Sequence, residues 1–205
     1  MFSADSVVIL DFETTGLSPN LGDCAIEIGA VRIKEGVVVE RFQELMNPGW
    51  PISGFIEGYT GISNAMLREA APCSEVMHRF ADFMGEDNLV AHNAGFDKRF
   101  LDAELRKISR TYPGKFVCSM LLARRVFQDA PNHKLGSLVD YMKLPSDGSF
   151  HRALYDSEMT AKLWLTMLSD IRGRYDIASI PFSLIQRLLK TPKKSVHSFL
   201  ETWKT

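Results

Sequence analysis

The 205-residue sequence has few cysteines, no long apolar run and almost no excess charge. Cys24, Cys73 and Cys118 are odd in number and widely spaced, which suggests neither a disulfide framework nor a zinc cluster. No apolar stretch approaches the ~18 residues of a membrane span, and the N-terminus lacks a basic segment followed by an apolar one. We therefore expect a soluble, cytoplasmic protein with reduced thiols and no contact with a membrane.

The near balance of charges excludes one way of binding nucleic acid. With 24 basic and 25 acidic residues, the net charge is -1. A protein that holds long stretches of nucleic acid by bulk positive charge needs many phosphate contacts. A short grip on a chain end is not excluded. The apolar fraction of 45% is typical of a globular protein, and the length suits about one domain with a short appendage.

The first half of the chain alternates strand and helix signals. Residues 6–12 are an apolar run typical of a buried strand, and 25–46 predict a hairpin of two strands. A Pro- and Gly-rich connection over 47–63 follows. An amphipathic helix then begins with Pro72 in its first turn, and 88–91 predict a short strand. This half therefore supplies most of a sheet.

The second half is mainly helical. Periodicity returns at about Phe96 and ends before Pro113, and a last short strand is expected at 116–117. Further helices are predicted over 121–127, 134–142 and 153–170. An antiparallel meander followed by alternating helices and strands indicates an α/β fold, a sheet of mixed strand directions covered by helices.

The C-terminal tail has two more helical patterns, at 182–189 and 196–203. We divide the chain into a domain of residues 1–171 and a helical extension of residues 172–205. No Gly/Ser-rich linker separates the two, which favours helices packed on the domain. The alternative is a helical hairpin that docks a partner protein.

Two acids close the first strand. Asp11 and Glu13 are two residues apart, so their side chains share one strand face with Val7 and Ile9. Carboxylates placed this way repel each other and resist ionising together unless a cation compensates them. Taken alone, they are equally compatible with two exposed acids at a strand end.

Two further acids, Asp97 and Asp156, favour a metal site. Oxygen-rich clusters bind Mg²⁺ or Mn²⁺, and two such ions ~3.5 to 4 Å apart can hold the attacking and leaving oxygens of a phosphodiester. No thiol lies near these residues, which disfavours zinc. His151 precedes the last long helix, and an imidazole titrating near ~6.5 suits a base that takes a proton from water at neutral pH.

The segments DFETTG, HNAGFD and HRALYD resemble the three exonuclease motifs of the DEDDh family, to which the proofreading epsilon subunit of bacterial DNA polymerase III belongs. The match covers about residues 6–168 in order and spacing. Arg152 stands where the tyrosine subfamily has its Tyr, which indicates the histidine subfamily. Two departures are visible: Cys118 replaces an acid common in relatives, and GYTGIS lacks a histidine often seen there.

The resemblance implies an RNase H-like fold of about five strands. It implies that Asp11, Glu13, Asp97 and Asp156 bind two divalent cations, Mg²⁺ with Mn²⁺ as a substitute, and that His151 is the general base. It also implies a set of substrate-binding residues, namely Thr14, Thr15, Gly16, Leu17, His92, Asn93 and Phe96. For the second group there are simpler interpretations: TTG suits a turn, and Phe96 suits the core.

The expected activity is removal of nucleotides from single-stranded 3′ ends as 5′-monophosphates, with DNA favoured. Residues 172–205 would contact a polymerase or another replication or repair protein. The alternatives are an exoribonuclease that trims RNA 3′ ends, a non-catalytic module that binds a polymerase or helicase, and an internal nuclease on the same fold. Discrimination of RNA from DNA depends on contacts to the 2′-hydroxyl that a sequence does not reveal.

Overall fold

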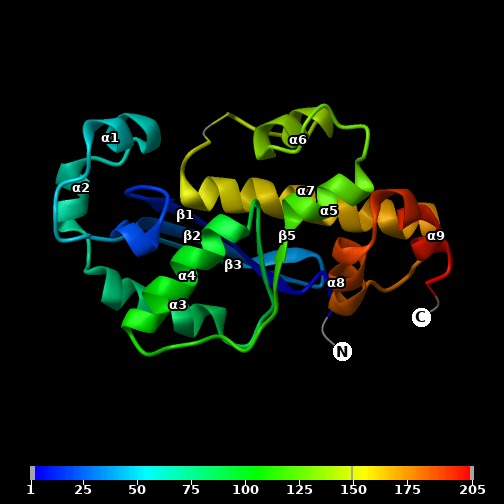
Figure 1. The fold of residues 1–205 in the computed structure, drawn as a ribbon, viewed down its shortest axis with the longest axis horizontal. Helices are drawn as coiled ribbons and strands as arrows, with labels where there is room; N and C mark the ends of the chain where they lie inside the picture. Colours follow the sequence, from blue (N-terminus) through cyan, green and yellow to red (C-terminus); the bar gives the residue numbers. More distant parts are fainter. Residues whose placement is uncertain (1–2, 149, 204–205) are drawn as a thin grey trace.

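A five-stranded mixed sheet forms the centre of the computed structural model, which describes residues 3–148 and 150–203. Its strands are β1 (Val7–Thr14), β2 (Ala25–Lys34), β3 (Val37–Leu45), β4 (Leu89–Ala91) and β5 (Phe116–Cys118). They lie in the order β3-β2-β1-β4-β5 (Figure 1). The first three pair antiparallel, whereas β4 and β5 join parallel to β1. This arrangement confirms the predicted RNase H-like α/β fold.

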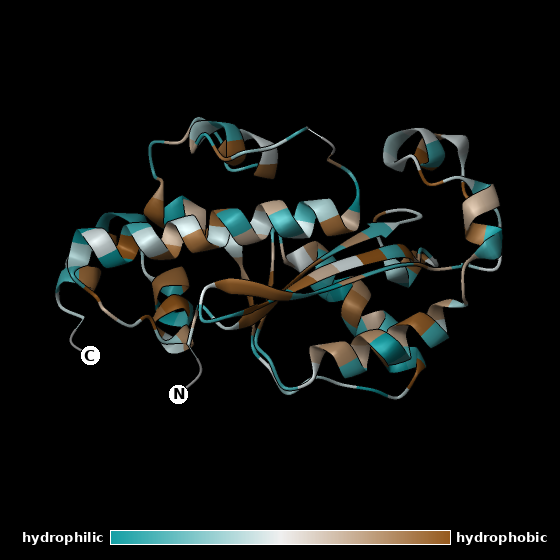
Figure 2. Cartoon of the chain, turned by 180° about the vertical axis from the view of Figure 1, so that it is seen from behind, coloured by the Kyte–Doolittle hydropathy of each residue, from teal (hydrophilic) through white to brown (hydrophobic). Residues whose placement is uncertain are grey.

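Helices cover both faces of the sheet. Val8, Leu10 and Phe12 face α3 (Cys73–Met84) and α4 (Gly95–Lys107). The opposite face of β1, which begins with Val7 and Ile9, packs against α5 (Ser119–Val126) and α7 (Ala153–Tyr175), with α6 (Leu135–Tyr141) packed on α7. Figure 2 shows apolar residues along the central strands and hydrophilic residues on the exposed turns of the helices. β1 is thus buried on both sides, as its continuous apolar run predicts.

The tail packs on the same core as the rest of the chain. Its helices are α8 (Phe182–Lys190) and α9 (Val196–Glu201), joined by the 3₁₀ turn Lys193–Ser195. Ile185, Leu188 and Leu200 are buried in one apolar cluster with α5 and α7. α7 runs to Tyr175, so the division predicted at 171/172 falls within a helix. The outer limits of that division, residues 1 and 205, lie outside the described residues.

The connection predicted over 47–63 contains one short helix, and a second directly follows it; the sequence analysis missed both. α1 (Gly54–Thr60) and α2 (Asn64–Glu69) begin at Ser53 and Ser63, whose hydroxyls accept hydrogen bonds from backbone N–H groups at the start of each helix. Each helix is about two turns or less, too short to show a 3.6-residue period. The pair lies at the end of the molecule opposite α8 and α9 (Figure 1). The Pro- and Gly-rich connection is therefore partly helical, although no helix was predicted in it.

Within residues 3–148 and 150–203, no helix combines the length and apolar character needed to cross a membrane. A further short element, the 3₁₀ helix Pro19–Leu21, lies between β1 and β2.

Candidate active site

The second half of β1 carries the first two acids. Asp11 and Glu13 alternate with Phe12 and lie on the sheet face that α7 covers. In the antiparallel ladder Glu13 stands directly opposite Glu27 of β2. The prediction that both acids share a strand face is confirmed, although β1 continues past them to Thr14.

Two helix N-termini bring the other acids to this strand. Asp97 lies in the first turn of α4, only 2% exposed, and its Oδ1 accepts a hydrogen bond from the Phe12 backbone N at 3.2 Å. Asp156 lies in the first turn of α7. Its Oδ2 accepts a hydrogen bond from the His151 backbone N at 3.0 Å. A helix N-terminus favours a negative charge, which suits both carboxylates to their positions.

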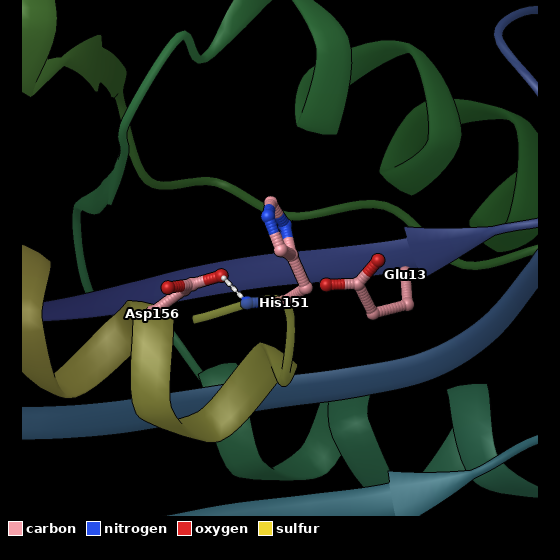
Figure 3. A group of neighbouring side chains, drawn as sticks. All are labelled: Glu13, His151 and Asp156. Atoms are coloured by element: carbon pink, nitrogen blue, oxygen red, sulfur yellow. Dashed lines mark hydrogen bonds between the residues drawn. The ribbon is translucent and has the colours of Figure 1, made fainter. Parts of the chain in front are cut away.

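His151 stands between two of these acids. Figure 3 shows its imidazole rising between the carboxylates of Glu13 and Asp156. One ligand atom from each of the three residues lies within 4.8 Å of the others, a spacing that could hold a metal ion. The His151 backbone has φ 70°, a left-handed conformation that a non-glycine residue adopts only where its surroundings impose it.

All the predicted site residues line one cavity of about 710 Å³. These are Asp11, Glu13, Thr14, Thr15, Gly16, Leu17, His92, Asn93, Phe96, Asp97, His151 and Asp156. The cavity also has a wall that the sequence analysis missed, formed by α1. Phe55 and Tyr59 lie one helical turn apart on α1, with exposed fractions of 75% and 52%. Their i, i+4 spacing after a Ser was the signal that could have revealed it.

The α1 wall contacts the histidine directly. The Tyr59 ring lies 4.2 Å from the His151 ring, centroid to centroid, and the Phe55 ring stacks on Tyr59 at 6.0 Å with an angle of 10° between planes. Three aromatic rings therefore lead from the acids toward solvent.

The segment after β1 closes the other side of the cavity. The Thr14 hydroxyl donates to the Gly16 carbonyl at 2.6 Å, and Asp23 accepts from the Ser18 backbone N at 2.9 Å. A Cβ atom on Gly16 would lie 2.4 Å from the Asp23 carboxylate, so a larger residue here would force the Asp23 side chain to move. Leu17, 77% exposed, projects at the rim.

His92 is held inside the protein. Its Nδ1 contacts the Ser119 hydroxyl and its Nε2 the His133 carbonyl, each at 2.9 Å. Burial lowers the pKa of His92 to about 4, so the ring is neutral at physiological pH. Both ring nitrogens are engaged, so a contact with substrate through them would require these bonds to break.

The acids are poorly compensated in the described structure. Burial and then the Asp156 charge raise the pKa of Glu13 to about 8, and burial raises that of Asp97 to about 7 and of Asp156 to about 6. The pKa of Asp11 is also well above its usual value, because of burial and then the Asp97 charge. Asp156 Oδ1 is buried without a hydrogen-bond partner among the described residues. A divalent cation would supply the missing positive charge and the missing partner, so the donor set fits such ions.

Comparisons with known proteins give the family. A family model described as "Exonuclease" matches residues 8–164. The PolC-type DNA polymerase III of Caldanaerobacter subterraneus is 36% identical over 192 residues, which cover 93% of this chain and 14% of that protein. A structure of Exonuclease X in complex with 5′ overhanging duplex DNA is 30% identical, with a TM-score of 0.66, over 80% of this chain and 91% of that one. The chain therefore belongs to the exonuclease family, whose enzymes are hydrolases.

The fold likeness extends to a more distant enzyme. The nuclease domain of 3′hExo, a DEDDh family member bound to rAMP, superposes with a TM-score of 0.70 at 22% identity, over 81% of this chain and 92% of that one. DEDDh exonucleases use divalent metal ions, and the group of Glu13, His151 and Asp156 could bind one. The chain spans 14% or less of the length of the curated polymerases that it matches.

Proposed function

We propose that the protein removes nucleotides one at a time from the 3′ end of single-stranded DNA and releases nucleoside 5′-monophosphates, with two Mg²⁺ ions bound. The observation that carries this proposal is the convergence of four buried or half-buried carboxylates and one histidine in a single cavity. In our proposal Asp11, Glu13, Asp97 and Asp156 hold the ions, and Mn²⁺ substitutes for Mg²⁺. When bound, the ions neutralise charge on the phosphate and stabilise the attacking and leaving oxygens.

His151 has the role of general base. Its imidazole lies beside Glu13 and Asp156, where it can accept a proton from a water molecule as that water attacks the terminal phosphorus. The new bond joins the water oxygen to phosphorus, and the bond to the leaving 3′ oxygen breaks. The hydrogen bond from the His151 backbone N to Asp156 keeps the base at a fixed distance from the acids.

The cavity walls would select a free end. The Thr14–Leu17 segment lies on one side and the α1 wall, Phe55 and Tyr59, on the other, and both line the cavity that holds the acids. Terminal bases must leave a duplex stack to enter such a site, and exposed aromatic rings stack on single-stranded bases. DNA is favoured over RNA because the curated relatives are named DNA polymerases and the Exonuclease X complex contains DNA.

The tail of 172–205 has a second proposed role. We propose a nuclease domain of residues 1–171 with residues 172–205 as an extension, and the buried residues of α8 and α9 support packing of that extension on the domain. We propose that the exposed side of this extension contacts a polymerase, as the similarity to PolC-type polymerases suggests. Retention of a purified PolC polymerase core on the immobilised chain, lost when 172–203 are exchanged for another sequence, tests this role.

The test of the activity uses 5′-labelled single-stranded DNA and RNA of one sequence with Mg²⁺, Mn²⁺ or EDTA. We expect a ladder that shortens from the 3′ end on DNA, abolished by EDTA and by Asp11→Ala. A stronger ladder on RNA would reassign the protein as an exoribonuclease. Cleavage of a circular single strand would indicate an internal nuclease, and intact substrates in every lane would favour the binding module.

A further inference from the structure

Glu27 is a buried carboxylate beside the site that the predicted residues do not include. It lies near the start of β2, between β3 and β1 in the sheet, fully buried and directly opposite Glu13. Four donors surround it: Arg152 Nε at 3.2 Å and Nη2 at 2.9 Å, the Ala153 backbone N at 3.1 Å and Gln43 Nε2 at 2.8 Å. Its hydrogen-bonding capacity is therefore filled from the start of α7 and from β3.

A glutamate at this position is a costly choice for stability alone. Like charges directly opposite each other on two strands are destabilising, and burying an ion pair costs more than burying an apolar residue of similar volume. The Glu27 charge also raises the pKa of Glu13, after burial and Asp156. This cost suggests that the Glu27 carboxylate has a role other than stabilising the fold.

That role concerns the turn that carries the histidine. Two of the three residues that donate to Glu27, Arg152 and Ala153, directly follow His151, whose backbone is left-handed. Asp156 donates its backbone N to the Arg152 carbonyl at 3.0 Å. The side chain of Arg152, the N-cap residue of α7, makes no capping hydrogen bond. The Glu27 carboxylate on β2 caps the helix instead, because it accepts a hydrogen bond from the Ala153 backbone N in the first turn.

Close packing of β2 on α7 reinforces this contact. A Cβ atom on Gly29 would lie 2.0 Å from the Leu154 backbone N, and the Ser157 hydroxyl donates to the Gly29 carbonyl at 2.8 Å. β2 thus holds the first turn of α7 at three points: Glu27, the Gly29 backbone and the bare α-carbon of Gly29.

We propose that Glu27 is a positioning residue, which holds Arg152 and Ala153 so that His151 and Asp156 stay beside Glu13 and the Arg152 cation pairs with Glu27 and not with Glu13. This inference rests on the proposed function for its kinetic consequences. The effect of Glu27 on metal affinity can be measured without turnover. Partners of metal ligands typically change affinity or activity by about 10- to 100-fold when they are removed.

The test compares Glu27→Gln, Glu27→Ala, Arg152→Ala and the double variant Glu27→Ala/Arg152→Ala. The measurements are Mn²⁺ affinity by calorimetry without substrate, kcat and KM on single-stranded DNA, and thermal melting. The matched control is Glu104→Gln. Glu104 is another buried glutamate, and both of its carboxylate oxygens accept from Lys107 on α4; within residues 3–148 and 150–203 it has no hydrogen bond to the His151 turn.

In Glu27→Ala the freed Arg152 guanidinium is expected to pair with Glu13. Mn²⁺ affinity should fall about 10-fold or more and kcat about 100-fold, with KM changed less than about 3-fold. Glu27→Gln, which keeps the shape and one acceptor, should lose about 10-fold in kcat. The double variant should regain Mn²⁺ affinity because the competing cation is gone, while kcat stays low because the turn is no longer held.

The control should melt lower yet keep kcat and Mn²⁺ affinity within about 2-fold. If Glu27→Ala and Glu27→Gln behave like this control, Glu27 is merely structural and the proposal is overturned. If the double variant binds Mn²⁺ as weakly as Glu27→Ala does, Glu27 has no role in keeping Arg152 from pairing with Glu13. A wild-type protein without turnover would sink the proposed function, whereas the Mn²⁺ titrations would still decide on Glu27.

Discussion

The two ends of α7 differ in what they bury. The first turn buries Asp156 and Ser157 against β1 and β2, and one carboxylate oxygen there has no partner among the described residues. The later turns bury mainly apolar side chains, including Leu163, Trp164 and Leu168, in the cluster shared with α5, α8 and α9. Trp164 also donates its indole N–H to the Ala4 carbonyl at 2.8 Å.

The comparison teaches how a helix can present an unfavourable group. Apolar burial stabilises by about 25 cal/mol per Å², so the C-terminal two thirds of α7 anchor the helix without help from its first turn. The N-terminal turn can then hold a carboxylate with a raised pKa close to other acids. Stability and chemistry are separated along one element, and substitutions at its two ends should have different effects.

The largest effect is expected from Asp156→Asn at the N-terminal end. The amide keeps the shape and the acceptor for the His151 backbone N but removes a charge that a cation needs. Loss of a metal ligand costs several kcal/mol of transition-state stabilisation, so activity should fall at least about 10³-fold. Initial rates on a 5′-labelled single strand measure this, with circular dichroism as the check on folding. Normal turnover of this variant would contradict the two-metal assignment.

Leu168→Ala, at the C-terminal end of α7, should lower stability and leave activity nearly unchanged. The truncation leaves a cavity in the apolar cluster and should lower the free energy of unfolding by about 2–5 kcal/mol. Urea denaturation measures the loss. At 20 °C, where the protein stays folded, kcat should remain within about 2-fold of wild type. A drop in kcat beyond about 10-fold would show that the two ends of α7 are coupled.

His151→Ala should affect rate and leave stability nearly unchanged. A positioned general base contributes about 10²- to 10⁴-fold, and we expect a loss of about 10²-fold at neutral pH. Part of the rate should return at pH 9, where hydroxide is more abundant. The pH profile of kcat for variant and wild type is the measurement, and a variant profile parallel to that of wild type would refute the assignment of the base.

Without divalent ions, the acids should make stability depend on pH. The folded-state pKa values of Glu13 and Asp156 are about 8 and about 6, whereas both groups titrate near ~4 in an unfolded chain. The folded protein therefore binds more protons, and the stability present below about pH 4 is lost as pH rises through 6 and 8.

Melting temperatures with EDTA from pH 5 to 8.5 should accordingly fall by about 5–10 °C. Mn²⁺ should abolish most of this decline. Glu13→Gln, which cannot ionise, isolates the contribution of one acid, and its decline should be smaller than that of wild type. Equal slopes for variant and wild type would rule out Glu13 as a source.

The smallest effect is expected from Tyr59→Ala, which removes the ring beside His151. Stacking on an aromatic ring contributes about 1–3 kcal/mol per base, and for a half-exposed ring we expect about 1 kcal/mol, a roughly 5-fold weaker affinity for single-stranded DNA. Fluorescence anisotropy measures this affinity. The titration uses the Asp156→Asn background, which prevents cleavage of the DNA. Trp50→Ala, which removes an exposed aromatic outside the cavity, is the control and should bind normally.

Much of the fold and the acidic cluster could be predicted from local patterns. A period of two places Asp11 and Glu13 on one face, and the start of a helical period places Asp97 and Asp156 in first turns. These signals depend only on residues close in sequence, so they can be interpreted without knowledge of the tertiary structure. The resemblance to exonuclease motifs then placed the cluster in order along the chain.

Other features depend on contacts that no local pattern encodes. Glu27 is one of several acids in its hairpin, and its role arises from Arg152, 125 residues further along the chain. The α1 wall was missed because two short capped helices carry no period. No partner of His92 could be predicted from the sequence, whereas in the structure both of its ring nitrogens are engaged.

The small apolar cluster beneath α1 and α2 makes this part of the molecule exchangeable. Ile52, Ile62 and Leu67 pack on Ile26 as a core separate from the two larger clusters of the described chain. Exchange of the whole 52–67 segment should therefore leave the carboxylates in place while altering the surface that meets the nucleic acid. An engineer could graft the corresponding segment of another nuclease here and change the preferred substrate, in the way that an antibody changes its antigen by replacing a loop.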